Sequence, residues 1–390
     1  MSQLTTLFTD IADAIRSKNG ESAQIPALSF PEKIEALEVV QIEEGSKGVY
    51  YDEDGIPHEV ESAETAIVEN GTPEELFNWN TEKSFVRGIV IDKEGCVCCA
   101  ADSMLYKVSE TGEKIWEYNA YEGSSCNGLS HIDVDSVGNI YVADSVRGPL
   151  KCSPNGELIW SSPVWYNANT FYCIHVLTDN NIFIGYDKTS GYSAYISTFD
   201  ANGNNLRQND WSAYRPYDIK SCNEDYVIVS CHDGNVLKLT PNLSEVWWYM
   251  DTRETLTGPQ MNAVALDSKE YIYVAETKGI TKLDLSGNFM WEYVQSGYGF
   301  ESICCNSFDQ IIAGASSKLK IVKITDMDNK ELEYEISSDT GGYSVYDMAV
   351  DSRNNIYVTS KNSLIKLSNT SVKKGVATYT LPESSGGGVQ

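Results

Sequence analysis

A hairpin-like pattern recurs along this chain at nearly constant spacing, and this repeat constrains the fold more than any other feature. The stretch HIDVDSVGNIYVADS at 131–145 alternates apolar and polar side chains around a turn-forming break. Near copies, VALDSKEYIYVAETK and MAVDSRNNIYVTSKN, occur at 264–278 and 348–362. Seven copies align at intervals of 43, 43, 44, 45, 39 and 45 residues, on Asp92, Asp135, Thr178, Cys222, Asp267, Asn306 and Asp351. Repeats of this length are typical of solenoids and propellers.

Each copy contains four short segments with the two-residue periodicity of β-strands. In the second copy they read LSHIDVD, NIYVAD, PLKCS and ELIWSS. A helical repeat would show a period of 3.6 residues, which these segments lack. The third and fourth segments are joined by turn-rich stretches such as SPNGE and DLSGN, whose Asn, Asp and Gly residues accept the left-handed backbone of a hairpin. The sequence therefore predicts an all-β, seven-bladed β-propeller over 75–381, with one blade per repeat.

The last strand of several copies carries a tryptophan, which we interpret as a wedge between neighbouring blades. These tryptophans are Trp116, Trp160, Trp247, Trp248 and Trp291. The segment ELFNWN at 75–80 has the same pattern, yet it precedes the first blade. We expect it to complete the last blade and close the ring. VATYTL at 376–381 is a competing candidate for that outer strand, and the sequence does not decide between the two. The blade pattern resembles NHL-repeat and quinoprotein-type propellers, a resemblance that concerns architecture and not function.

Residues 1–40 have the pattern of two short helices. Apolar side chains at 4, 7, 8, 11 and 15 share one helical face. Ser29-Phe30-Pro31-Glu32 forms a capping box with proline in the first turn of a second helix. Two helices of this length are too small to build a stable core alone. Their apolar faces are therefore expected to dock on each other in an oligomer or on a larger assembly.

The N-terminal sequence resembles a short module of tail proteins from bacteriophages and prophages of Gram-positive bacteria. The matching residues are Ile11 to Arg16, Lys18, Gly20, Ile25, Phe30, Pro31, Lys33 and Ile34, and the following KGVYYDEDGIPHEVE resembles a strand-turn-strand element often found after this module. The resemblance implies a helical attachment module at 1–40 and a strand-turn-strand linker at 41–74. The propeller follows at 75–381, and the composition of LPESSGGGVQ at the end indicates a flexible tail at 382–390. It also implies a virion (tail) location after synthesis in the bacterial host cytoplasm. The residues expected to contact other tail or baseplate proteins are Leu7, Phe8, Ile11, Ile15, Phe30 and Ile34. A homo-oligomer is expected, with a trimer favoured.

Charge and cysteine usage exclude several classes of protein. The net charge of −27 opposes binding to nucleic acids and to anionic membranes. No run of about 18 apolar residues occurs, so no membrane insertion is expected. The ten cysteines show no zinc-type spacing, and several occupy apolar strand positions. We therefore expect free thiols, a reducing compartment of synthesis, no metal site and no cofactor.

No catalytic motif is present, and the four histidines include two, His131 and His175, expected at satisfied interior positions of first strands. The linkers between blades are instead rich in aromatic and arginine residues, which suit sugar rings and protein partners. The candidate ligand-binding residues are Trp165, Tyr166, Tyr121, Tyr214, Arg215, Tyr298, Tyr343, Arg147 and Arg253. The predicted function is a non-enzymatic tail fibre or receptor-binding protein that adheres to a host surface glycan or protein. A polysaccharide depolymerase and a purely structural tail or baseplate component remain alternatives. Acids converging on the central funnel would favour the enzyme, and an aromatic, acid-poor funnel would favour adhesion.

Overall fold

The structure is a computed structural model. It describes residues 47–51, 57–61, 63–83, 85–121, 128–144, 148–162, 168–188, 194–210, 215–222, 226–232, 234–250, 260–324, 330–336, 344–369 and 371–378. The predicted N-terminal helices, and with them all six attachment residues, lie outside this part of the chain. The chain divides into two compact units, residues 70–370 and the remainder.

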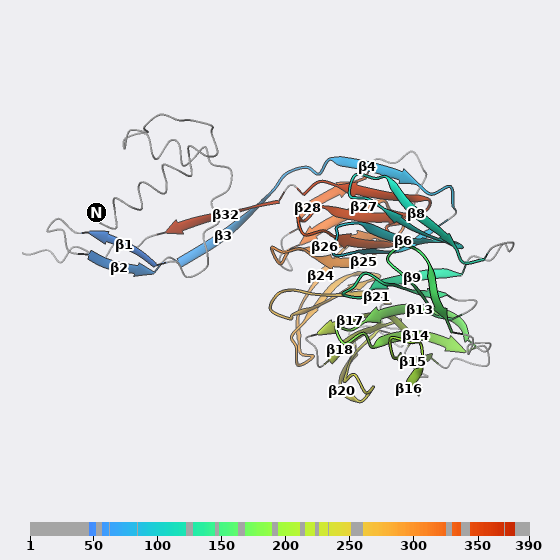
Figure 1. Ribbon diagram of the computed structural model, residues 1–390. Helices are drawn as coiled ribbons and strands as arrows, with labels where there is room; N and C mark the ends of the chain where they lie inside the picture. Colours follow the sequence, from blue (N-terminus) through green and yellow to red (C-terminus); the bar gives the residue numbers. More distant parts are fainter. Residues whose placement is uncertain are drawn as a thin grey trace, which may run out of the picture. The chain divides into compact units, whose positions relative to one another are not determined.

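The larger unit consists of seven four-stranded antiparallel sheets, so the predicted seven-bladed propeller is confirmed (Figure 1). The first blade consists of β5 (Val86–Ile91), β6 (Val97–Ala101), β7 (Met104–Val108) and β8 (Lys114–Asn119). The second consists of β9 (Leu129–Val134), β10 (Ile140–Asp144), β11 (Leu150–Cys152) and β12 (Leu158–Ser161). The third consists of β13 (Ala168–Val176), β14 (Ile182–Lys188), β15 (Ala194–Phe199) and β16 (Asn205–Asp210). The fourth consists of β17 (Pro216–Cys222), β18 (Tyr226–Cys231), β19 (Asn235–Leu239) and β20 (Glu245–Met250). The fifth consists of β21 (Met261–Leu266), β22 (Ile272–Glu276), β23 (Gly279–Leu283) and β24 (Phe289–Val294). The sixth consists of β25 (Phe300–Cys305), β26 (Ile311–Ala315), β27 (Lys320–Ile324) and β28 (Lys330–Glu335). The seventh is β29 (Asp347–Val350), β30 (Ile356–Ser360), β31 (Ser363–Leu367) and β4 (Glu75–Asn80).

The ring is closed by a strand from the N-terminal side of the propeller. β4 pairs with β31, and Trp79 lies opposite Leu364. The expectation that the ELFNWN segment completes the last blade is therefore confirmed. The competing segment falls partly in β32 (Ser371–Thr378), which pairs with β3 (Ala63–Asn70) in the smaller unit. The propeller thus ends about ten residues earlier than the predicted 381. The smaller unit also contains the hairpin of β1 (Lys47–Tyr51) and β2 (Pro57–Glu61), in the stretch where the sequence indicates a strand-turn-strand element.

The turn between the first two strands of a blade explains the aspartate that recurs in the repeat. The Asp135 carboxylate accepts hydrogen bonds from the backbone N–H groups of Val137 and Asn139 at 3.1 and 2.8 Å. Its second oxygen accepts one from the Tyr141 hydroxyl at 3.1 Å. The turn of the third blade begins at Leu177, not at the aligned Thr178, because the Leu177 N–H donates to the Asn181 carbonyl as the equivalent groups do elsewhere. The alignment of that copy was therefore wrong by one residue.

The hydrophobic core lies between blades. One buried cluster joins Cys98 and Leu105 of the first blade to Ile132 and Val142 of the second, and another joins Tyr106 of the first to side chains of the seventh. All nine cysteines in the described part of the chain are free thiols, buried or half-buried. Among the described residues, none forms a helix with the length and apolarity needed to span a bilayer.

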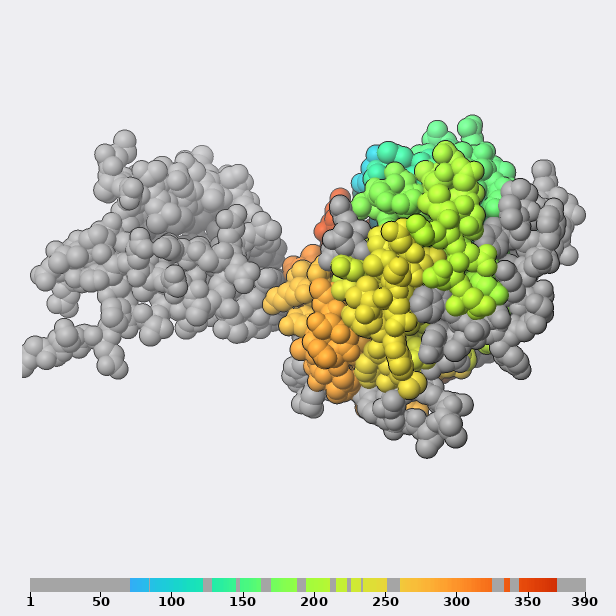
Figure 2. Space-filling model, turned by 90° about the horizontal axis from the view of Figure 1, so that it is seen from below, coloured from blue at the N-terminus to red at the C-terminus, as the bar shows by residue number. Residues whose placement is uncertain are grey.

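The tryptophans of the outer strands act as wedges between blades, as expected from their spacing. The indole N–H groups of Trp116, Trp160 and Trp247 each donate to a carbonyl in the next blade, at 3.0–3.1 Å. Trp248 is different, because its side chain is 47% exposed. The fourth and fifth blades, which carry Trp247, Trp248 and Trp291, lie side by side at the surface in Figure 2 (yellow and orange).

Candidate functional site

The first strand of every blade faces a central channel. These seven strands contact one another in a closed circle, in the order β5, β9, β13, β17, β21, β25, β29 and back to β5. Each strand starts at one end of the channel and reaches its hairpin turn at the other end. Residues at equal distances before the turn therefore form rings around the channel axis, each with one residue from every blade.

We define the channel mouth as the ring five residues before the residue that opens each turn. It consists of Arg87, Ser130, Tyr172, Tyr217, Asn262, Glu301 and Tyr346, and all seven line a cavity of about 560 Å³. The mouth lies at the end of the channel where the inner strands begin. Linkers from each outer strand to the next inner strand reach the same end, because an inner strand begins where such a linker finishes. The mouth is thus a shared cavity to which every blade contributes a side chain.

Three tyrosines make the mouth aromatic. The rings of Tyr172 and Tyr217 lie 5.3 Å apart, centroid to centroid, and Tyr217 also packs edge-on against His232 at 5.0 Å. The Tyr346 ring packs edge-on against Phe85 at 5.9 Å. All three tyrosines are half-buried, so part of each ring remains accessible. Half-accessible, fixed aromatic rings can provide contact area with little loss of side-chain entropy.

Two opposite charges lie among these tyrosines. Arg87 is exposed, and its guanidinium carbon lies 5.3 Å from the centroid of the Phe85 ring. Glu301 is half-buried, and burial raises its pKa while the positive charge of Arg87 opposes that shift. Burial and the nearby Glu301 carboxylate also raise the pKa of Tyr346, which keeps its hydroxyl neutral.

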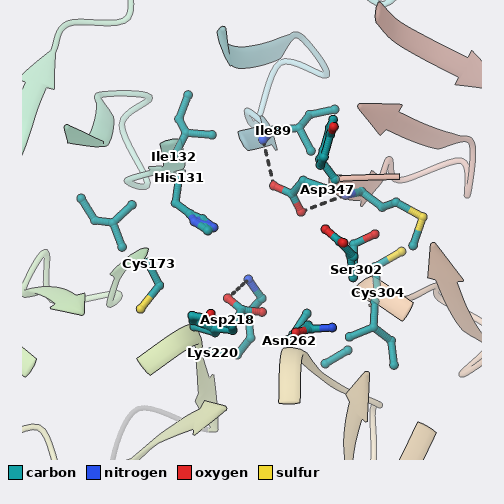
Figure 3. A pocket seen from close by; sticks show the side chains of 18 of the residues that line it. Ile89, His131, Ile132, Cys173, Asp218, Lys220, Asn262, Ser302, Cys304 and Asp347 are labelled. Atoms are coloured by element: carbon teal, nitrogen blue, oxygen red, sulfur yellow. Dashed lines mark hydrogen bonds and ion pairs between the residues drawn. The ribbon is translucent and has the colours of Figure 1, made fainter. Parts of the chain in front are cut away.

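Towards the hairpin turns, the mouth adjoins an inner chamber of about 340 Å³. Its polar lining includes His131, Asp218, Lys220 and Asp347, which Figure 3 shows directed into one common space. Burial lowers the pKa of His131 to about 4, so the imidazole is neutral at pH 7. The chamber and the mouth share several lining residues and form one continuous channel.

The acids of the channel hold neighbouring blades together. Asp347 of the seventh blade accepts a hydrogen bond from the Ile89 N–H of the first blade at 3.0 Å, and Asp218 accepts one from the Val264 N–H of the fifth blade at 3.0 Å. The Asp133 carboxylate of the second blade likewise accepts the Val176 N–H of the third at 2.9 Å. Because these oxygens satisfy buried backbone donors, we call the three aspartates inter-blade latches.

His175 of the third blade links Asp133 of the second blade to the backbone of the fourth. Its Nδ1 lies 2.8 Å from the Asp133 carboxylate, and its Nε2 accepts the Ser221 N–H at 3.0 Å. A ring that accepts at Nε2 must carry its proton on Nδ1, so the imidazole is the neutral Nδ1–H tautomer. Although burial opposes it, the contact with His175 lowers the pKa of Asp133. His131 also contacts a backbone oxygen, that of Tyr172. The expectation that His131 and His175 are satisfied interior residues is confirmed.

Burial and the charges of the inner chamber shift the pKa values of Asp347 and Lys220. Burial raises the pKa of Asp347 to about 7, an effect strengthened by Asp218 and opposed by Lys220. Lys220 is exposed to the chamber. Partial loss of bulk water lowers its pKa, but the charges of Asp218, Asp347 and Asp133 raise it more, so the group remains an ammonium. The Lys220 Nζ pairs with Asp218 at 3.2 Å. The chamber is therefore a partly compensated charge network that serves ring closure.

The stability of the protein should report the titration of Asp347. A carboxyl whose pKa is about 7 in the folded state and about 3.9 in the unfolded state binds more protons when folded, so its stabilising contribution falls as pH rises from about 4 to 7. The full shift would correspond to about 4 kcal/mol, and water in the channel reduces this to roughly 1–3 kcal/mol. We expect the free-energy difference between the wild type and Asp347→Asn to change by this amount between pH 4.5 and 8 in urea unfolding.

The matched control for this measurement is Asp200→Asn. The Asp200 carboxylate lies in an exposed turn, and its hydrogen bonds with Asn204 lower its pKa. The pKa of Asp200 is lower in the folded state, so its contribution is lost only as pH falls below about 4. The wild-type minus Asp200→Asn difference in the free energy of unfolding should therefore stay nearly constant between pH 4.5 and 8. If the difference in the free energy of unfolding between the wild type and Asp347→Asn does not change with pH, the elevated pKa of Asp347 is contradicted.

The linker residues chosen from the sequence have three different outcomes. Tyr121 and Tyr298 are buried, at 1% and 8% exposure, and their hydroxyls donate to Asp144 and Glu333. Their rings pack against the following blade, which argues against a ligand-binding role for both. Arg215 is half-buried near Tyr172, where burial and Asp187 raise the pKa of the tyrosine and the charge of Arg215 opposes the rise, and so it lies next to the mouth. The remaining candidates lie outside the described residues: Arg147, Trp165, Tyr166, Tyr214, Arg253 and Tyr343.

The mouth residues themselves were missed by sequence reasoning, although a signal for them exists. Six of them follow an apolar residue in the first strand of their copy, for example Phe171-Tyr172, Pro216-Tyr217 and Phe300-Glu301, and Tyr346 follows Val345 just before β29. The residue at this position of the repeat, taken from each of the seven aligned copies, gives one such residue per blade. Loops carry function more often than strands, which favours linker residues over residues of the inner strands.

Within the described part of the chain, metal-ligating atoms come close together at Asp92, Glu94 and Cys96. The Lys107 ammonium already pairs with Asp92 at 2.7 Å and lies 3.6 Å from Glu94. Burial and the Asp92 charge raise the pKa of the Cys96 thiol, which disfavours the thiolate that metals bind. The group therefore serves as an ion pair at the edge of the first blade.

Comparisons with known proteins support the fold. No protein-family model and no curated protein matches the sequence. Among solved structures, streptogramin B lyase is similar with a TM-score of 0.65 and 15% identity, over 77% of this chain and 98% of that one. Virginiamycin B lyase from Staphylococcus aureus gives 0.62 and 13%, over 78% and 99%. Raptor from Chaetomium thermophilum gives 0.65 and 12%, over 78% of this chain and 30% of that one. At these identities the similarity shows the propeller fold alone.

Proposed function

We propose that this chain is a tail fibre or receptor-binding protein of a bacteriophage or prophage of Gram-positive bacteria, and that its propeller adheres to a host surface ligand at the channel mouth. The observation that carries the binding role is the mouth itself. It is a cavity of about 560 Å³ to which all seven blades contribute, with three half-accessible tyrosine rings. Concave sites with aromatic walls and a few polar groups are the common form of ligand sites.

The acids of the channel support adhesion over hydrolysis. Three aspartates do converge below the mouth, which by number would favour a depolymerase. Their oxygens, however, accept backbone N–H groups of neighbouring blades, as described for Asp133, Asp218 and Asp347. A carboxylate that holds the ring together is poorly placed to transfer protons to a sugar. Three of the seven mouth residues above them are tyrosines, and Glu301 is the one acid among the seven.

The virion role rests on the N-terminal sequence resemblance. The proposed module at 1–40 attaches the protein to other tail or baseplate proteins and joins copies into an oligomer, with a trimer favoured. Several propellers on one particle would multiply weak single-site affinities. The ligand is a surface glycan or protein. The net charge of −27 disfavours polymers that carry negative charge alone.

Deleting residues 1–40 should separate attachment from adhesion. We expect the shortened protein to fold and to adsorb to host cells, since the propeller contains its own core, and to lose incorporation into tails almost completely. Incorporation is measured by immunoblot of purified particles, and adsorption by depletion from solution. Reducing-sugar release from host wall material is measured in parallel, and none is expected. Normal incorporation of the shortened protein would contradict the attachment role, and sugar release would support the depolymerase.

A further inference from the structure

Two opposite charges flank one tyrosine in the channel mouth. Arg87 of the first blade and Glu301 of the sixth lie on either side of Tyr346 of the seventh in the ring order. All three line the same cavity, in or next to inner strands that are neighbours in the ring. Nevertheless, no ion pair within 4.0 Å joins the guanidinium to the carboxylate. Within the described part of the chain, no hydrogen bond or ion pair engages the Glu301 carboxylate either, in contrast to the latched aspartates.

An open pair of opposite charges discriminates between ligands by charge. A group with only a positive charge would be attracted by Glu301 and repelled by Arg87, and a group with only a negative charge would meet the reverse. A group that carries both charges can satisfy both side chains at once. Complementary potentials of this kind determine specificity more than total affinity.

We propose that the channel mouth recognises a zwitterionic substituent, a protonated amine together with a phosphate or carboxylate, on a host surface polymer. The inference rests on the proposed function, since it uses the same site. Glu301 receives the ammonium group, and the Asn262 carbonyl oxygen is a second acceptor, because the Asn262 amide nitrogen already donates to Phe300 at 2.7 Å. Arg87 receives the anionic group through its planar donors. Tyr346 lies between them and offers its ring face to the ammonium group.

The test uses phosphoethanolamine as the probe, with ethanolamine and inorganic phosphate as single-charge controls. Binding to the full-length protein is measured by calorimetry. We expect phosphoethanolamine to bind about tenfold or more tightly than either control, and Glu301→Gln and Arg87→Gln each to remove most of that preference. Glu94→Gln and Arg353→Gln, exposed charges near the opposite end of the blades, should change nothing. Equal affinity for all three probes would contradict recognition of a zwitterionic group. So would a loss of the preference for phosphoethanolamine in only one of the two mouth variants.

Two further measurements separate this inference from its alternatives. Phosphoethanolamine also occurs as a lipid headgroup, so vesicles of phosphatidylethanolamine in phosphatidylcholine are compared with soluble substituted polysaccharide. Retention on the polysaccharide alone supports the proposal, and retention on the vesicles would contradict a polymer ligand. If phosphoethanolamine does not bind, while adsorption to host cells still depends on the mouth tyrosines, the proposed zwitterionic ligand is wrong and the proposed binding function is retained. If adsorption does not depend on the mouth at all, the proposed function itself falls.

Discussion

Replacing Tyr217 and Tyr346 together with alanine is expected to weaken adsorption of the protein to host cells by about tenfold or more. The two rings lie in the fourth and seventh blades, and each aromatic contact with a ligand contributes roughly 0.5–1.5 kcal/mol beyond the area it buries. On a particle with several copies the loss is larger, because avidity multiplies the single-site affinities. The measurement is depletion of purified protein, or of virions, by host cells, together with a melting curve.

The matched control removes two tyrosines from the other end of the channel. Tyr226 and Tyr271 are also half-buried and lie beside the hairpin turns, where the ammonium groups of Lys238 and Lys282 contact their rings at 4.3 and 4.0 Å. Replacing both with alanine should lower the melting temperature about as much as the mouth variant does, and should leave adsorption to host cells unchanged. If the mouth variant adsorbs normally with a normal melting temperature, the receptor site lies elsewhere, and the linker with Trp165 and Tyr166 becomes the next candidate.

Replacing Trp247 with alanine should destabilise the propeller far more than replacing its neighbour Trp248. The Trp247 indole donates to the Leu285 carbonyl at 3.1 Å, and its ring packs so closely on Gly287 that a Cβ there would lie 2.8 Å away. Losing this wedge leaves a cavity between blades and removes one of two hydrogen bonds to the Leu285 carbonyl, which still accepts the Lys238 ammonium at 3.3 Å. We expect a cost of about 2–4 kcal/mol. Trp248 is 47% exposed, so its loss should cost less than about 1 kcal/mol.

The two variants differ by one position in the same strand, which makes each the control of the other. Thermal unfolding followed by circular dichroism should show a decrease of roughly 5 °C or more for Trp247→Ala and a decrease near zero for Trp248→Ala. Similar decreases in both would mean that the outer strand, and not the contact with the next blade, determines the effect.

The repeat determined the fold because the same local pattern occurs seven times and no blade can bury its faces alone. Spacing placed the blades, the turn aspartates and the closing strand correctly. It misplaced the third turn by one residue, since Leu177 lacks the aspartate that opens the turn in four of the other copies. For the site, the sequence indicated aromatic linkers, but two of these tyrosines proved to be buried against the next blade. Whether a linker tyrosine faces solvent or a neighbouring blade depends on packing between repeats, which no periodicity encodes.

The strand that closes the ring has a consequence for synthesis. β4 is among the first propeller segments to leave the ribosome, and its partner β31 is among the last, with 281 residues between the linked positions Thr81 and Asn362. At about 5–20 residues per second, Phe77 and Trp79 wait roughly 15–60 s without their partner strand. During that interval an unpaired strand edge with apolar side chains is a hazard for aggregation between nascent chains. Slow elongation or a crowded polysome should therefore reduce the yield of this protein more than that of a propeller whose last blade closes from one continuous segment.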